Sequence, residues 1–154
     1  MVTFLVMVVS IARGQSETLT LSLDSASSRY RYVEVIPTPG KTKEDVRTFV
    51  RSMVTSPSII VLDTEDEIIL RYTTPMGSFK FLKLTEHFWF RDDKFRWAVE
   101  DLEYLLNVSK LSHFDQLEKL DERQRRKLMP EIEGLLAEGR ANMLGKINAT
   151  AEKW

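Results

Sequence analysis

Residues 87–97 read HFWFRDDKFRW, and this stretch decides which fold the chain adopts. Aromatic and polar residues alternate on both sides of Asp92-Asp93-Lys94, which has the composition of a tight turn between two strands. If the turn centres on Asp93, Trp89 and Trp97 are cross-strand partners that share one face of a sheet. The stretch therefore predicts a β-hairpin with its two tryptophans side by side.

The same two strands mix aromatic rings with cations, and they form the best candidate for a ligand-contacting surface. We assign Trp89, Arg91, Arg96 and Trp97 to it. Rings beside cations can stack the bases of single-stranded nucleic acid or the rings of sugars. The alternative is a hydrophobic sheet face that helices cover, with the arginines on the opposite face. We favour this alternative, because large aromatic side chains are highly buried on average.

Strand and helix signals alternate on the N-terminal side of the hairpin. Residues 29–36 alternate as a strand does, and Pro37-Thr38-Pro39-Gly40 ends that strand. Thr42 then has the position of a helix N-cap, with Asp45 in the capping-box position three residues later. We expect the first helix over residues 43–54.

Further strands lead from this helix to the hairpin. Residues 58–63 contain the β-branched run typical of a buried strand, residues 67–73 form its return strand, and residues 78–91 are extended. Residues 95–106 fit both a strand and a helix stripe, and the preceding turn favours a strand through about Leu102.

The C-terminal part of the chain reads as helical. Residues 117–128 and 131–152 are charged and amphipathic, and Pro130 separates them. We expect two helices.

This order of elements resembles a domain of unknown function with a TATA-binding-protein-like fold, found in exported proteins of Bacteroidetes. The resemblance covers residues 29–107. The stretches that carry it are Tyr32-Val33-Glu34-Val35, Gly40-Lys41-Thr42-Lys43-Glu44, Ile59 to Leu70, and Asp92-Asp93-Lys94-Phe95-Arg96-Trp97.

The resemblance implies an α+β fold in an extracytoplasmic protein. Its sheet is antiparallel, with about five strands in the order β-α-β-β-β-β-α, and helices pack on one face. A helical tail follows. We therefore divide the chain into a signal peptide (1–14), a leader or edge strand (15–28), the α+β domain (29–107) and a helical C-terminal extension (108–154). The resemblance supplies no catalytic residues.

The N-terminus has the features of a secretory signal. Residues 2–12 are apolar and uncharged, and as a helix they reach only about half the thickness of a hydrocarbon core. Ala12-Arg13-Gly14 places small residues where a signal peptidase cleaves. No Lys or Arg precedes the apolar run, so a buried first strand is the alternative. We expect export to the periplasm or the outside of the cell, with no membrane span in the mature chain.

Composition excludes several chemistries. The chain contains no cysteine, which rules out disulfides, thiolate nucleophiles and thiolate metal sites. Lys and Arg total 22 against 23 Asp and Glu, a balance that argues against nucleic acid as the partner. His87 and His113 are the only histidines, and neither lies in a metal-binding motif. The acidic turn at residues 63–67 lacks the spacing of a calcium loop. We expect no cofactor and no metal.

The sequence leaves three functions open. The first is a noncatalytic binding or structural module of the cell envelope, whose partner is a protein, a peptide or a glycan. The second is a hydrolase whose carboxylates meet only in the fold. The third is nucleic-acid binding, by analogy of fold alone. We favour the first, because the chain contains no recognisable catalytic motif.

Overall fold

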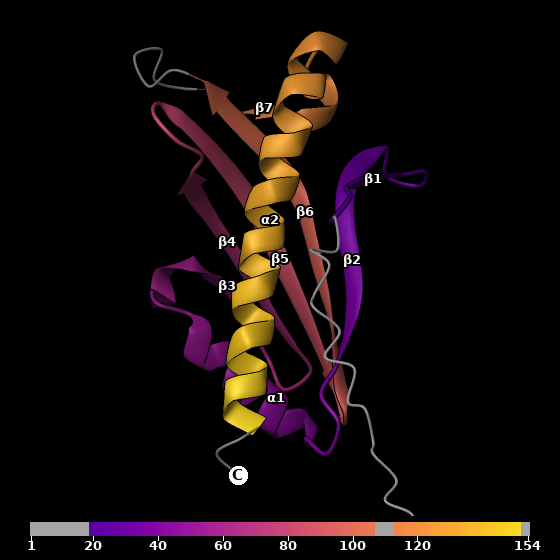
Figure 1. Cartoon of the computed structure of the whole chain (residues 1–154), viewed down its shortest axis with the longest axis vertical. Helices are drawn as coiled ribbons and strands as arrows, with labels where there is room; N and C mark the ends of the chain where they lie inside the picture. The colour runs from indigo at the N-terminus through magenta and orange to yellow at the C-terminus, as the bar shows by residue number, and fades with distance from the viewer. Residues whose placement is uncertain (1–18, 107–112, 152–154) are drawn as a thin grey trace, which may run out of the picture.

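A computed structural model describes residues 19–106 and 113–151. In it a seven-stranded antiparallel sheet carries two α-helices, α1 and α2, on one face (Figure 1). The strand order is β1-β2-β6-β5-β4-β3, and β7 pairs with β6. The elements are β1 (Ser22–Asp24), β2 (Arg29–Pro37), α1 (Lys43–Met53), β3 (Ile60–Asp63), β4 (Glu67–Pro75), β5 (Lys80–Arg91), β6 (Lys94–Leu106), β7 (Asp115–Gln116) and α2 (Glu122–Ala151).

The predicted hairpin of β5 and β6 is present, but its register differs from the prediction by one residue. Asp92 and Asp93 alone form the turn, and Asp93 adopts a left-handed backbone (φ 63°), which aspartate enters more readily than most residues. Trp89 therefore pairs with Arg96, not with Trp97. Because side chains alternate along a strand, the two tryptophans point to opposite faces of the sheet. The predicted tryptophan pair is wrong.

This register determines which side chains of β5 and β6 face the helices. Trp97 pairs with Phe88 on the face that α1 and α2 cover, and both are buried. Trp89 and its neighbour His87 lie on the opposite, largely polar face. The preference for a helix-covered aromatic face is thus confirmed for Trp97 and wrong for Trp89.

Helix α1 begins at the predicted cap. The Thr42 side chain accepts a hydrogen bond from the Asp45 backbone, and the Asp45 carboxylate accepts one from the Thr42 backbone in return. Val46 and Val50 are buried against the sheet, and Phe49 is half-buried beside them.

The turn of the β5–β6 hairpin also fixes the start of α1. The Asp92 carboxylate accepts a hydrogen bond from the Lys43 backbone (2.8 Å), and the Asp93 carboxylate accepts one from the Gly40 backbone (2.7 Å). The hairpin and α1 are therefore one structural unit.

The predicted buried strand at residues 58–63 is an edge strand. Strand β3 pairs only with β4, and the side chains of Val61 and Leu62 are 56% and 36% exposed. A β-branched run predicts an extended backbone, and both buried strands and edge strands are extended. The run therefore does not distinguish between them.

Strand β6 resolves the ambiguity of residues 95–106 in favour of a strand, which continues past Leu102 to Leu106. Its alternation shifts at Asp101, which has a φ of 52°. Core side chains therefore change from odd positions (Trp97, Val99) to even ones (Leu102), and this shift imitates a helical period.

The two predicted C-terminal helices are one. Helix α2 runs through Pro130 without a break, and only a short 3₁₀ turn occupies Leu117–Lys119. Proline costs the hydrogen bond to the carbonyl of Arg126, but Leu128 and Ile132 bury their side chains on both sides of it. Tertiary packing therefore outweighs the local penalty.

Helix α2 shares its core with the sheet. Ile132 (fully buried), Leu136 and Met143 belong to the same cluster as the sheet residues Phe88 and Trp97. Residues 122–151, expected in a C-terminal extension, thus cover the sheet of the α+β domain.

The N-terminal segment adds one edge strand to the sheet. Residues 22–24 form β1, while Leu19 and Leu21 before it are buried. Of the predicted segment 15–28, residues 22–24 lie in this edge strand. The predicted signal peptide at residues 1–14 lies outside the described residues. Within the described residues, no helix combines the length and apolar character that a bilayer crossing needs.

We expect Ile132→Ala to lower the free energy of unfolding by about 2–5 kcal/mol, because it leaves a cavity between α2 and the sheet. Chemical denaturation followed by circular dichroism measures the change. The control is Glu138→Ala on the exposed side of α2, which should stay within about 0.5 kcal/mol of the wild type. Equal stability of the two variants would show that α2 is not part of the core.

Candidate binding cavity

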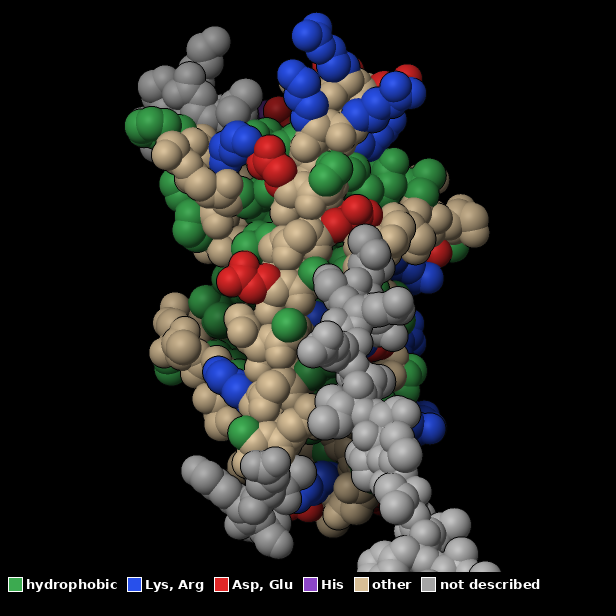
Figure 2. Space-filling view, viewed as in Figure 1, with side chains coloured by type: hydrophobic (Ala, Val, Ile, Leu, Met, Phe, Trp, Pro, Cys, Tyr) green, Lys and Arg blue, Asp and Glu red, His purple; other side chains and the backbone are tan. Residues whose placement is uncertain are grey.

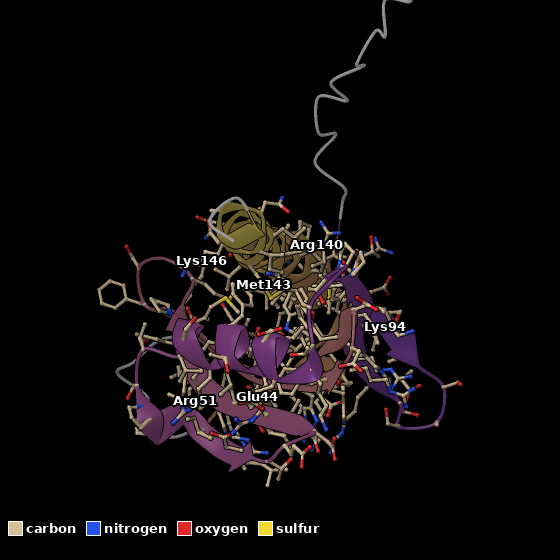
Figure 3. All side chains as sticks on the ribbon, turned by 90° about the horizontal axis from the view of Figure 1, so that it is seen from below. Glu44, Arg51, Lys94, Arg140, Met143 and Lys146 are labelled. Atoms are coloured by element: carbon tan, nitrogen blue, oxygen red, sulfur yellow. The ribbon has the colours of Figure 1, made fainter. Side chains whose placement is uncertain are left out.

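A cavity of about 440 Å³ lies between α1, α2 and the helix face of the sheet. Helix α2 forms its roof with Gly139, Asn142, Met143 and Lys146, which recur at helical spacing on one side of the helix. In Figure 3, α2 is seen nearly end-on above α1, and the labels of Met143 and Lys146 lie on the side of α2 that faces α1. The cavity is open to solvent rather than sealed.

One carboxyl group stands among the apolar residues of the floor. Glu86 of β5 accepts a hydrogen bond from Trp97 Nε1 (3.1 Å) and another from the Tyr72 hydroxyl. All three residues line the cavity. Glu86 lies deep between the helices and the sheet, and part of its surface faces the open space.

Burial raises the pKa of the Glu86 carboxyl, and its two hydrogen bonds oppose this effect. Burial also raises the pKa of the Tyr72 hydroxyl, and the neighbouring Glu86 adds to the rise. Tyr72 therefore acts as a hydrogen-bond donor and not as a phenolate. A carboxyl group with a perturbed pKa in a cavity is a common feature of functional sites.

The rest of the cavity wall is largely apolar. Helix α1 contributes Val50 and Met53, and the sheet contributes Leu70 and Phe88. Apolar walls with a few polar groups are typical of small-molecule sites, and the volume falls in their usual range.

An ion pair fixes the roof to the sheet. Arg140 of α2 donates two hydrogen bonds to Glu34 of β2, at 2.7 and 2.6 Å. Glu34 also accepts a hydrogen bond from the Tyr32 hydroxyl (2.7 Å), and the Tyr32 ring contacts the edge of Trp97 at 5.4 Å between centroids. A continuous chain of contacts thus links the roof of the cavity to Glu86 through Trp97.

The ion pair between Arg140 and Glu34, which we call the clamp, favours the charged form of Glu34. The Arg140 guanidinium holds the pKa of Glu34 below its usual value, and the Tyr32 hydroxyl adds to the effect. Burial, followed by the hydrogen bond to Glu34, raises the pKa of Tyr32 to about 12.

The predicted ligand-contacting surface is divided between the two faces of the sheet. Trp97 lines the cavity, whereas Trp89, Arg91 and Arg96 border a hollow of about 450 Å³ on the opposite side, with Lys94 beside them. The Arg96 guanidinium lies 4.8 Å from the centre of the Trp89 ring. The four residues do not form one surface, and ligand contact remains a prediction for each.

The sheet face opposite the helices also contains a cluster of polar side chains that the sequence did not reveal. His87 lies between two carboxylates, with Nδ1 3.3 Å from Glu67 and Nε2 2.9 Å from Glu100. These residues come from three neighbouring strands, so only the sheet brings them together. Among the described residues, no group of three His, Cys, Asp or Glu has the arrangement of a metal site.

The acidic turn between β3 and β4 is paired with α1. Lys43 binds Glu65 and Asp66 (2.7 and 2.9 Å), and Arg47 binds Asp63 (2.6 Å). These ion pairs give the acidic residues a structural role.

The sequence analysis missed Glu86, although a signal for it exists. In β5 the even positions 82, 84, 88 and 90 carry Leu, Leu, Phe and Phe, and all four are buried. Glu86 is the one charged residue in this series. A carboxyl group at a core position is rare unless it is paired or functional.

The geometry agrees with two solved structures. A TBP-like protein from Parabacteroides distasonis matches with a TM-score of 0.57 at 9% identity, over 79% of this chain and 92% of that chain. A DUF4468 family protein from Bacteroides ovatus matches with a TM-score of 0.56 at 7% identity, over 87% and 92%. No family model matches the chain, and no curated protein matches its sequence.

At these identities the likeness shows the fold alone. The chain has the α+β fold of the TBP-like class, with an antiparallel sheet and helices on one face, as the sequence analysis predicted.

We expect Glu34→Gln to lower the free energy of unfolding by about 1–3 kcal/mol near neutral pH, because the charge-assisted hydrogen bonds between Arg140 and Glu34 are weakened. The folded-state pKa of Glu34 is depressed, so its contribution is complete above the unfolded-state pKa and is lost as pH falls through the folded-state value. The gap between variant and wild type should therefore shrink below about pH 4. Urea titrations from pH 3 to 7 measure it.

The matched control for this series is Glu138→Gln, which changes an exposed carboxylate on α2, the helix that carries Arg140. It should follow the wild type at every pH. A gap for Glu34→Gln that stayed constant down to pH 3 would contradict the clamp.

Proposed function

We propose that the protein is an exported, noncatalytic domain that binds a ligand in the cavity between α1, α2 and the sheet. One observation carries the proposal: Glu86 occupies a core position of β5, and open space lies beside it where a core residue would have a packed neighbour. Proteins keep an isolated carboxyl group in such a place at a cost in stability, and ligand binding gives a reason to retain it.

The hydrolase alternative needs two carboxyl groups near one reacting bond. Of the residues that line the cavity, only Glu86 carries a carboxyl group. The neighbouring Glu34 is held by Arg140 and Tyr32 outside the lining. The cavity therefore supports binding better than it supports hydrolysis.

The nucleic-acid alternative needs a continuous basic surface. The basic side chains at the start of α2, among them Arg123, Arg126 and Lys127, gather at one end of the molecule (Figure 2). Arg91 and Lys94 lie beside the hairpin turn, which contacts the start of α1 at the other end (Figure 1). The two groups are too far apart to form one surface.

Binding in the cavity can be tested with n-octanol, a neutral apolar probe. We expect n-octanol to shift the methyl resonances of Met53 and Met143 in ¹H–¹³C spectra, with saturation, because both residues line the cavity. Gly139→Phe should weaken this binding about ten-fold or more by filling the roof. A Cβ atom at Gly139 meets no atom within 4 Å, so a side chain can start there without a backbone clash.

The matched control is Gly145→Phe. Gly145 lies on the same helix, a Cβ atom there also meets nothing within 4 Å, and the residue does not line the cavity. It should bind n-octanol as the wild type does. Absent methyl shifts, or equal weakening by both variants, would contradict the proposal.

Export predicts a processed N-terminus. We expect the protein recovered from its native host to begin near Gln15, because Ala12-Arg13-Gly14 follows the apolar run. Mass spectrometry of the intact protein from cell-envelope and cytosolic fractions measures this. Protein that keeps residues 1–14 and remains in the cytosol would contradict export.

A further inference from the structure

We infer, resting on the proposed function, that the cavity selects a ligand with an apolar body and a protonated amine that pairs with Glu86. The inference concerns the chemical class of the ligand. It rests on three observations. These are the acceptor sites of Glu86 that have no donor, the side chains around Glu86, and the position of Lys146, the other charged residue that lines the cavity.

Glu86 has unused capacity to accept hydrogen bonds. A carboxylate offers about four acceptor sites, and Tyr72 and Trp97 supply two donors. Within the described residues, Glu86 takes part in no ion pair. A ligand beside it therefore gains most by offering further donors, and a positively charged donor also stabilises the ionised form of Glu86, which burial disfavours.

Aromatic side chains surround Glu86. Tyr72, Phe88 and Trp97 line the same cavity, and Phe88 and Trp97 are cross-strand partners on its floor. The tyrosine hydroxyl and the tryptophan N–H already point to Glu86, so the rings stay in place before the ligand arrives.

The remaining wall fits an alkyl or aryl body. Val50, Met53 and Met143 come from the two helices, and Leu70 comes from the sheet. Methionine side chains are flexible and polarisable, so they adapt to ligands of different outline. This part of the cavity selects for apolar area rather than for one shape.

The opposite orientation, with an anionic head group, is less favourable. Lys146 lines the cavity from α2, but it is exposed and lies at the solvent side of the roof. A carboxylate bound there would leave the interior acceptor Glu86 without a partner. A carboxylate bound deeper would lie against Glu86, and the two negative charges repel each other.

The test compares three probes of equal chain length: n-octylammonium, n-octanol and octanoate. The amine is protonated at pH 7, since alkyl ammonium groups titrate near the pKa of lysine, about 10.4. Titrations follow the Met53 and Met143 methyl resonances, which report binding at this site. We expect n-octylammonium to bind about ten-fold or more tightly than n-octanol, and octanoate to bind most weakly.

The variant Glu86→Gln tests whether Glu86 causes the tighter binding of n-octylammonium. It preserves the shape of the side chain and removes its charge, so the advantage of n-octylammonium over n-octanol should fall to about two-fold or less. Glu138→Gln removes a carboxylate from the exposed side of α2, and it should preserve the full advantage. Unchanged n-octanol binding by Glu86→Gln shows that the cavity of this variant is intact.

The outcomes separate the two proposals. If n-octanol binds but n-octylammonium binds no better, or if octanoate binds most tightly, the ligand class is wrong and the cavity remains a binding site. If the amine keeps its advantage in Glu86→Gln, the inference is also wrong. If none of the three probes shifts the methionine methyls, both proposals fail. The comparison of probes in the wild type decides the ligand class even if Glu86→Gln does not fold.

Discussion

The two-residue turn at Asp92 and Asp93 fixes the register of β5 and β6, and the two faces of the molecule depend on that register. Side chains alternate along both strands, so a shift by one residue would exchange their positions. With the observed turn, Glu86 and Trp97 face the helices, while His87 and Trp89 face the open side. The turn also accepts hydrogen bonds from the backbone at the start of α1, so the wall of the cavity and its floor are positioned by the same two residues.

The cavity exists because two helices cover one face of the sheet without closing over it. Helix α1 is short and capped at a defined residue, whereas α2 is long and crosses the sheet beside it (Figure 1). Buried Ile132 and Leu136 and the pair between Arg140 and Glu34 hold α2 in place. One face of α2 packs on the sheet through Ile132 and Leu136, and the same face lines the cavity at Met143. Met143 therefore belongs both to the core cluster and to the lining of the cavity.

Local chemistry in the sequence predicted the capping box of α1 and the hairpin, and the resemblance to the TATA-binding-protein-like domain implied the class of fold. It could not settle features that depend on distant partners. The prediction centred the turn on Asp93, whereas Asp92 and Asp93 together form the turn, so the register differs by one residue. Pro130 predicted a break in the helix, because the burial of Ile132 that compensates it is a property of the assembled core. Glu67 and Glu100 meet His87 only through sheet pairing. Glu86 is the instructive exception, since a charged residue in an otherwise apolar alternation was visible in the sequence alone.

The topology of α2 has a consequence for how the molecule forms. The hairpins of β3 to β6 join segments that are neighbours in sequence, whereas Arg140 and Glu34 are 106 residues apart. Contacts of low sequence separation form quickly, and long loops close slowly. The sheet can therefore assemble before α2 docks on it, which leaves the aromatic floor around Phe88 and Trp97 exposed to solvent in the interval. A nascent chain at this stage exposes apolar surface of the kind that chaperones bind. Docking of α2 then covers this surface.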